Sequence, residues 1–189
     1  SLLEQIRALG ELRVVTRNSP TAYFLGANGP EGPEYELANR FATRLGVALY
    51  IYTVPRLTQI KDEITSGRAH LAAAGLTISD DWKDVVSYGP TYQQVRQLLV
   101  YRMGQPKPRD MAAVNGGHLE VIAGSRHAEL LRELRGAMPD LVWVENRRDE
   151  SLDLLARVAN GDIDYTITDS TEFALAHALY PEIRVAFNL

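Results

Sequence analysis

The chain has 189 residues, with 20 lysines and arginines against 24 aspartates and glutamates, so its formal net charge is −4 at pH 7. This balance gives no broad attraction for nucleic acid, and the sequence contains no run of basic residues. Cysteine is absent, which excludes disulfides, thiolate metal sites and cysteine nucleophiles. No apolar run reaches the roughly 18 residues that span a bilayer. The amino terminus predicts a short amphipathic helix and no signal peptide, so we expect the chain as given to be soluble, with any export signal or anchor either removed or never present.

Short apolar strands alternate with helices along the first half of the chain. In order, the pattern predicts the strand Leu12–Thr16, the loop Arg17–Pro33, a helix that ends at Gly46, the strand Ala48–Val54, the helix Leu57–Ser66, and the strands His70–Leu76 and Val95–Arg102. The polar, proline-containing segment Met103–Gly117 then ends one unit and starts another.

The second half repeats this alternation. It predicts strands at Glu120–Ala123, Leu141–Glu145 and Tyr165–Thr168, and helices at Ala128–Arg135 and Ser151–Asn160. Alternating helices and short apolar strands predict an α/β fold with largely parallel sheets. We expect two lobes, at residues 1–102 and 103–189, with a ligand cleft between them, because clefts between domains are favoured binding sites.

The segment Gly32–Gly46 reads GPEYELANRFATRLG. Leu37, Phe41 and Leu45 recur every four residues and so share one face of a predicted helix, and the final glycine suits a left-handed cap. This pattern resembles the signature of the bacterial extracellular solute-binding proteins of the polar amino acid family. The residue after the first glycine is usually large and apolar in that family, and here it is Pro33. The alternative is an ordinary helix that feeds an α/β sheet.

Two polar residues follow predicted strands in the second half. Ser125 precedes a helix whose free amide donors suit a ligand carboxylate, and its hydroxyl either adds a donor or merely caps that helix. Asp169 ends another strand, where a carboxylate projects toward the cleft of an open α/β sheet and can accept hydrogen bonds from a ligand ammonium. Alternatively, Asp169 caps a helix at Ser170–Leu179. The resemblance favours ligand contact.

In the family, a segment that matches Ala73–Lys83 holds the backbone of an amino acid ligand. The resemblance implies that the carbonyl of Gly75 accepts from the ligand's amino group and that Thr77 donates to its carboxylate. Amino acid binders commonly carry an arginine at the position of Trp82, for a bidentate pair with that carboxylate. The tryptophan either walls the pocket or packs beneath the helix. The departure implies either that the chain is not specific for single amino acids or that carboxylate recognition falls to Thr77, Ser125 and backbone amides, with Arg126 as a candidate substitute.

The stretches LRVVTRNSPTAYF, GPEYEL, AAGLT and GPTYQQV together resemble the amino-terminal module of the membrane-bound lytic murein transglycosylase F family. The resemblance implies a two-lobed fold like that of type-II periplasmic binding proteins, a monomer, and no cofactor or metal. It places Asn18 and Tyr23 among the ligand-binding residues. In that family a solute-binding-like regulatory domain precedes a lysozyme-like catalytic domain. The implied ligand is an amino acid or small cell-wall peptide, which controls the attached enzyme.

The same resemblance implies periplasmic exposure and tethering of the parent protein to the outer membrane. Val95–Arg102 matches the outward crossing between lobes, and Arg184–Leu189 matches the start of the return. We therefore expect the final strand and helix of the first lobe to lie outside these 189 residues. One alternative is a free amino acid-binding subunit of an ABC importer, and another is an enzyme like cyclohexadienyl dehydratase.

The dipeptide Glu150-Ser151 matches the general-acid motif of transglycosylases, but it precedes an apolar-periodic run and is better explained as a helix cap. The histidines at positions 70, 118 and 177 show no metal-binding spacing. We therefore expect no catalysis from this chain.

Overall fold

The computed structural model describes residues 1–189 and divides them into two compact units. Unit 1 comprises Ser1–Ile78 and Trp82–Ser87, and unit 2 comprises Ser79–Asp81 and Tyr88–Leu189. The predicted lobe boundary at residue 102 therefore differs from the observed division. Residues 88–102 fall in unit 2 because their strand, β6 (Gln97–Arg102), pairs on both of its edges with strands of that unit.

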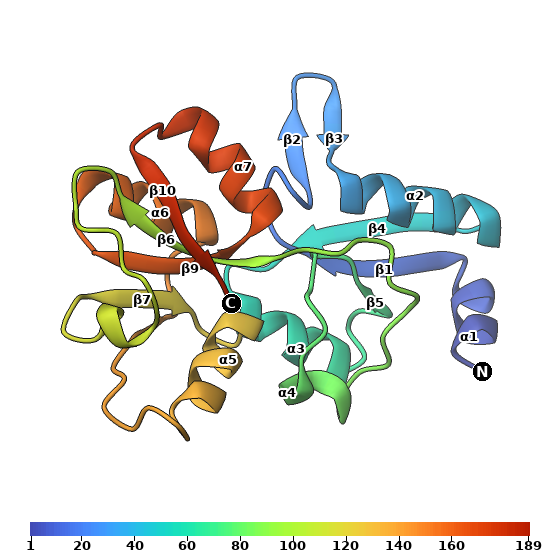
Figure 1. Cartoon of the computed structure of the whole chain (residues 1–189). Helices are drawn as coiled ribbons and strands as arrows, with labels where there is room; N and C mark the ends of the chain where they lie inside the picture. Colours follow the sequence, from blue (N-terminus) through green and yellow to red (C-terminus); the bar gives the residue numbers. More distant parts are fainter. The chain divides into compact units, whose positions relative to one another are not determined.

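Unit 1 is built on a three-stranded parallel sheet in the order β4-β1-β5. Its elements are α1 (Leu2–Leu9), β1 (Glu11–Thr16), β2 (Phe24–Gly26), β3 (Gly29–Glu31), α2 (Pro33–Leu45), β4 (Ala48–Thr53), α3 (Leu57–Thr65) and β5 (Leu71–Ala72). The helices α2 and α3 cover opposite faces of the sheet (Figure 1). Because β1 is the central strand, its residues Val14 and Val15 are completely buried.

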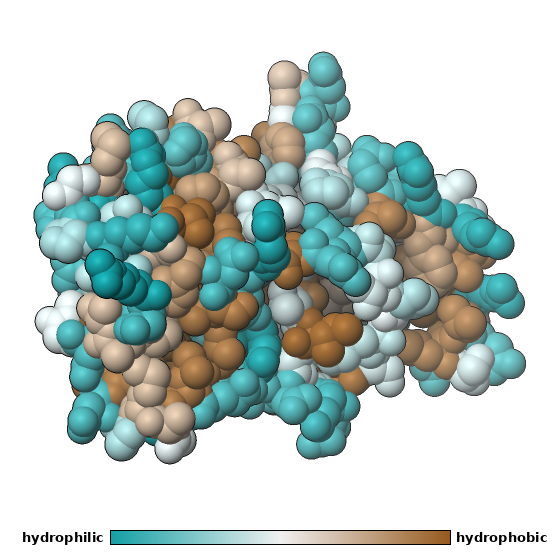
Figure 2. Space-filling model, viewed as in Figure 1, coloured by the Kyte–Doolittle hydropathy of each residue, from teal (hydrophilic) through white to brown (hydrophobic).

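The helix predicted to end at Gly46 is α2, and that glycine adopts the expected left-handed conformation with φ of 71°. Its buried apolar residues are Ala38 and Ala42, whereas Leu37 and Phe41 are 44% and 40% exposed. The predicted periodicity is thus present, but the packed face is shifted by one residue, since alanines let the helix approach the sheet closely. Figure 2 shows that exposed apolar residues lie among hydrophilic ones on the visible surface.

Unit 2 contains a five-stranded mixed sheet in the order β10-β6-β9-β7-β8. Besides β6, its elements are a 3-10 helix, η1 (Ala112–Val114), and β7 (Leu119–Ile122), α5 (Arg126–Leu134), β8 (Val144–Asn146), α6 (Ser151–Asn160), β9 (Tyr165–Asp169), α7 (Ser170–Leu179) and β10 (Ile183–Asn188). Helix α5 lies on one face of the sheet, and α6 and α7 lie on the other (Figure 1). The α/β class is confirmed in both units.

The parallel pairing of β7 and β9 fixes where the predicted polar residues of unit 2 lie. Leu119 is in register with Tyr165, so the two strands run side by side and their carboxyl ends reach the same edge of the sheet. β7 leads into α5 through Ser125, and β9 ends at Asp169 where α7 begins. Both helix starts therefore meet this edge.

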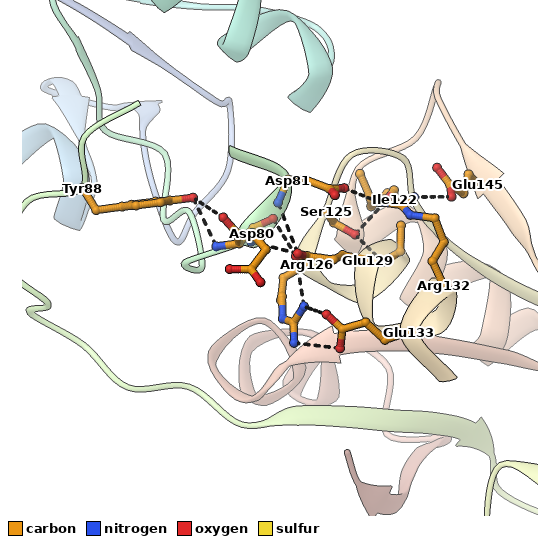
Figure 3. A network of polar contacts seen from close by, with 12 residues as sticks. Asp80, Asp81, Tyr88, Ile122, Ser125, Arg126, Glu129, Arg132, Glu133 and Glu145 are labelled. Carbon is orange, nitrogen blue, oxygen red and sulfur yellow. Dashed lines mark hydrogen bonds and ion pairs between the residues drawn. The ribbon is translucent and has the colours of Figure 1, made fainter. Parts of the chain in front are cut away.

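A buried carboxylate, Glu129 of α5, anchors the short segment Ser79–Asp81 within unit 2 (Figure 3). One of its oxygens accepts from the Ser79 hydroxyl at 2.6 Å, and the other accepts from the amides of Asp80 and Asp81 at 2.8 and 3.2 Å. These amides open the one-turn helix α4 (Asp80–Lys83), so the carboxylate supplies the negative charge that a helix start favours.

The charge of Glu129 is retained in spite of its burial. Burial alone raises the pKa of this carboxyl, but the hydrogen bond from Ser79 and the guanidinium of Arg126, at 3.0 Å, together lower it below the ordinary value. A folded-state pKa below the unfolded one means that ionisation stabilises the fold above the unfolded pKa. That contribution is lost as the pH falls through the folded pKa.

None of the helices is both long enough and apolar enough to cross a membrane.

Substituting Glu129→Gln removes the charge and keeps the side-chain size. We expect the free energy of unfolding at pH 7 to fall by about 2 kcal/mol. The remaining hydrogen bonds no longer involve a charged acceptor, and the amide nitrogen that replaces one carboxylate oxygen cannot accept from the donors that face it. Urea unfolding measures this loss. It should shrink as the pH falls from the ordinary pKa of a glutamate toward the lowered pKa of the folded state, because the wild-type carboxyl then becomes protonated as well.

The matched control is Glu133→Gln. Glu133 pairs with the same Arg126 at 2.6 Å, but its side chain is 49% exposed, so its loss should cost less than about 1 kcal/mol. Equal losses in the two variants would contradict the anchoring role of Glu129.

Candidate functional site

Ser125 occupies the start of α5 in unit 2 and caps that helix. Its hydroxyl oxygen accepts from the amide of Ala128 at 3.2 Å, and its hydroxyl hydrogen is donated to the carbonyl of Ile122 at 2.6 Å. The cap alternative raised by the sequence is therefore confirmed. A contact between Ser125 and a ligand remains a prediction. To donate to a ligand, the hydroxyl must give up its hydrogen bond to the carbonyl of Ile122.

Asp169 ends β9 at the same sheet edge, but its side chain makes no capping hydrogen bond to α7. Instead its Oδ1 lies 3.1 Å from Nε2 of His127, in the first turn of α5. The two side chains are 14% and 7% exposed, so they form a nearly buried carboxylate–imidazole pair. We call Ser125, His127 and Asp169 the β9 cluster. A carboxylate fixed in this way can accept hydrogen bonds from a cationic group.

Arg126, the candidate substitute for a carboxylate-binding arginine, is paired within its own helix. Its guanidinium lies 2.6 Å from Glu133 and 3.0 Å from Glu129, as Figure 3 shows. The hydrogen bond with Glu133 is the main cause that raises the pKa of Arg126 above its ordinary value. Two carboxylates thus compensate this one positive charge, which leaves Arg126 poorly suited to attract a third.

In unit 1, the predicted ligand-binding residues lie on the segment that follows β5. Gly75 is exposed and has a φ of 60°, a conformation that favours glycine. Thr77, two residues further on, is half-buried and has an interaction partner. Trp82 is only 5% exposed, and its carbonyl accepts from the amides of Val85 and Val86. The burial of Trp82 favours the packing alternative over a position that walls a pocket.

Asn18 and Tyr23 lie in the loop that follows β1. Both form isolated bridges, Asn18 with Tyr23 and Ser19 with Tyr23, which close the loop on itself. The Tyr23 ring meets that of Tyr35, in the first turn of α2, edge-on with the centroids 6.2 Å apart. Asn18 is exposed and Tyr23 is half-buried, so the loop presents an amide and a phenol near the carboxyl end of β1.

Two buried charges at this end of β1 were not among the predicted site residues. Arg17 follows the strand directly, is 7% exposed, and donates from Nε to the carbonyl of Ala74 at 3.2 Å. Glu34, in the first turn of α2, is 5% exposed, and its Oε1 lies 3.8 Å from where a Cβ on Gly75 would be. We call Arg17, Glu34, Ala74 and Gly75 the β1 cluster. The available signal was a charged residue immediately after a buried apolar run.

His127 and Glu129 were also missed. Both follow Ser125 in the sequence, but their partners Asp169 and Ser79 lie 42 and 50 positions away along the chain. No local spacing reveals such pairs.

Comparison with known proteins agrees with the α/β fold described above. The profile of the bacterial extracellular solute-binding proteins, family 3, matches residues 12–171. The membrane-bound lytic murein transglycosylase F 1 of Alkalilimnicola ehrlichii is 44% identical over 190 aligned positions, which cover 100% of this chain and 38% of that protein. The chain thus spans well under half the length of this curated relative.

Solved structures of amino acid-binding proteins have the same fold. The P235GK mutant of ArgBP from T. maritima superposes with a TM-score of 0.86 at 22% identity, covering 100% of this chain and 81% of that one. The amino acid ABC transporter substrate-binding protein AbpA from Streptococcus pneumoniae, bound to L-arginine, gives 0.85 at 18% identity, covering 98% and 79%. The fold is therefore the α/β fold of periplasmic binding proteins. The chain belongs to the bacterial extracellular solute-binding proteins, family 3.

Proposed function

We propose that this chain is the ligand-sensing regulatory domain of a peptidoglycan lytic transglycosylase and that it binds an amino acid or a small cell-wall peptide. The observation that carries the proposal is the match of the whole chain to the amino-terminal part of lytic murein transglycosylase F relatives. In this proposal the attached catalytic domain cleaves peptidoglycan, and ligand occupancy of the present chain controls it. The parent protein is periplasmic and tethered to the outer membrane, and the chain acts as a monomer.

The ligand contacts follow from the polar residues already described. Asp169 accepts hydrogen bonds from the ligand's ammonium, and Thr77 and Ser125 donate to its carboxylate, while the carbonyl of Gly75 takes a further ammonium hydrogen. The nearly buried position of Asp169 at a strand end supports this assignment, since its charge is weakly screened there. Asn18 and Tyr23 contact the remainder of the ligand.

A second candidate function is that of a free amino acid-binding subunit of an ABC importer. The likeness to AbpA, an ABC transporter substrate-binding protein, supports it. The two candidates differ in the length of the gene. A reading frame that continues into a lysozyme-like domain supports the regulator, whereas a stop soon after residue 189 beside a permease gene supports the importer.

Calorimetry of the chain with L-glutamate, L-arginine and the cell-wall dipeptide L-alanyl-γ-D-glutamate tests binding. Peptidoglycan digestion by the full-length protein, with and without a probe that binds, tests regulation. We expect at least one probe to bind and to change the rate of digestion. Binding without any change of rate would favour the importer, and the failure of all three probes to bind would overturn the proposed function.

Asp169→Asn keeps the side-chain size and leaves an oxygen that can still accept from His127. Affinity for the bound probe should fall at least tenfold, about 1.4 kcal/mol, because the ammonium loses a charged acceptor. The melting temperature without ligand should change little. Thermal melts with and without the probe separate the two effects, and a destabilised variant that retains the full ligand-induced shift would contradict ligand contact.

Ser125→Ala and Thr77→Ala separate capping from binding. Ser125→Ala should lower the free energy of unfolding by about 1 kcal/mol, because Ala128 loses its cap, and should also weaken binding. Thr77→Ala should weaken binding with a smaller effect on stability. Urea unfolding and calorimetry on both variants provide the measurements. Unchanged affinity in both variants would mean that other groups hold the carboxylate.

The isolated chain should release no anhydromuropeptides from purified peptidoglycan. Glu150 is the residue that matches the transglycosylase motif, and it lies at the start of α6, where its amide donates to Asp153 at 2.9 Å. Chromatography of the digest is the measurement. Release of anhydromuropeptides that Glu150→Gln abolishes would contradict the expectation and restore a catalytic role to this residue.

A further inference from the structure

The segment Ser79–Asp81 begins two residues after Thr77, which is a predicted ligand contact. The chain leaves unit 1 after Ile78, contributes these three residues to unit 2, and returns to unit 1 at Trp82. The carboxylate of Glu129 accepts three hydrogen bonds from the segment, one from each of its residues. Figure 3 shows these bonds converging on Glu129 from the start of α4.

Two other side chains of unit 2 also hold this segment. The guanidinium of Arg132 pairs with the carboxylate of Asp81, but both side chains are exposed, and exposed ion pairs contribute little. The hydroxyl of Tyr88 accepts from the amide of Ser79 at 3.2 Å. Of the three holding side chains, only Glu129 is both buried and in contact with every residue of the segment. Its ionised carboxylate therefore contributes most to the order of the segment among these three.

A ligand contact at Thr77 depends on where this segment lies. Ile78 is the one residue between Thr77 and Ser79, and its side chain is 55% exposed, so it adds little packing of its own. A displacement of Ser79 therefore also moves Thr77. Apparent affinity falls in proportion when the binding-competent arrangement is only partly populated. A segment that is ordered before binding also avoids an entropy cost when the ligand arrives.

We propose that Glu129 is a positioning residue for ligand binding, because its carboxylate holds Ser79–Asp81 in the arrangement that places Thr77 for the ligand. Glu129 acts without touching the ligand, since both of its oxygens accept hydrogen bonds from the segment. The inference rests on the proposed function, because it assumes that the chain binds a small ligand through Thr77. It adds a residue of α5 that controls the affinity of this site from a distance.

The experiment measures affinity and local order separately. L-Glutamate, L-arginine and L-alanyl-γ-D-glutamate are titrated by calorimetry against the wild-type chain, Glu129→Gln, Ser79→Ala and the double variant. Circular dichroism melts select a temperature at which each variant is folded. Hydrogen exchange at the amides of Asp80 and Asp81 is followed by NMR with and without a probe that binds. Ser79→Ala keeps the buried charge and removes one hydrogen bond to it, so it tests the same contact if Glu129→Gln does not fold.

We expect Glu129→Gln to lower the affinity for the probe by about fivefold or more, and Ser79→Ala to lower it by about twofold. The double variant should lose less than the two single losses combined, because both substitutions weaken one contact. Exchange at Asp80 and Asp81 should be faster in Glu129→Gln than in the wild type. A bound probe should slow this exchange in the wild type, since ligand binding and the order of the segment are linked.

The matched control is Glu133→Gln, one turn further along α5, where the carboxylate pairs with Arg126 instead of with the segment. It should leave both the affinity and the exchange unchanged. An equal loss of affinity in Glu133→Gln and Glu129→Gln would overturn the inference.

A merely structural role for Glu129 makes a different prediction. It lowers the free energy of unfolding but leaves the affinity of the folded variant unchanged, and this result would overturn the inference while the proposed function survives. Faster exchange at Asp80 and Asp81 with unchanged affinity would also overturn it, because the segment would then have no influence on the ligand contact. If no probe binds the wild-type chain, the proposed function fails and the inference fails with it.

Discussion

The buried negative charge of Glu129 is the interaction on which the polar part of unit 2 depends. A carboxylate removed from water needs donors around it, and here a hydroxyl, two amides at a helix start and a guanidinium supply them. Satisfying this one group has two consequences. It fixes Ser79–Asp81 on α5, and it commits Arg126 to a partner within its own helix.

Both units position their polar groups by the same geometric rule. The carboxyl ends of parallel strands meet at one sheet edge, so residues that follow different strands become neighbours. In unit 1 this rule joins Arg17, after β1, with the peptide after β5. In unit 2 it joins Asp169, at the end of β9, with the helix that follows β7. β6 runs antiparallel to β9, so its amino end reaches the same edge, where Gln97 is in register with Asp169.

The sequence predicted the elements whose patterns are local. The left-handed cap at Gly46 and the helix start at Ser125 follow from residue type and spacing, and both are present. The packed face of α2 was not predictable from Leu37 and Phe41, because close approach to the sheet favours alanine over bulk. The pairing of His127 with Asp169 was hidden because only the parallel register of β7 and β9 brings them together.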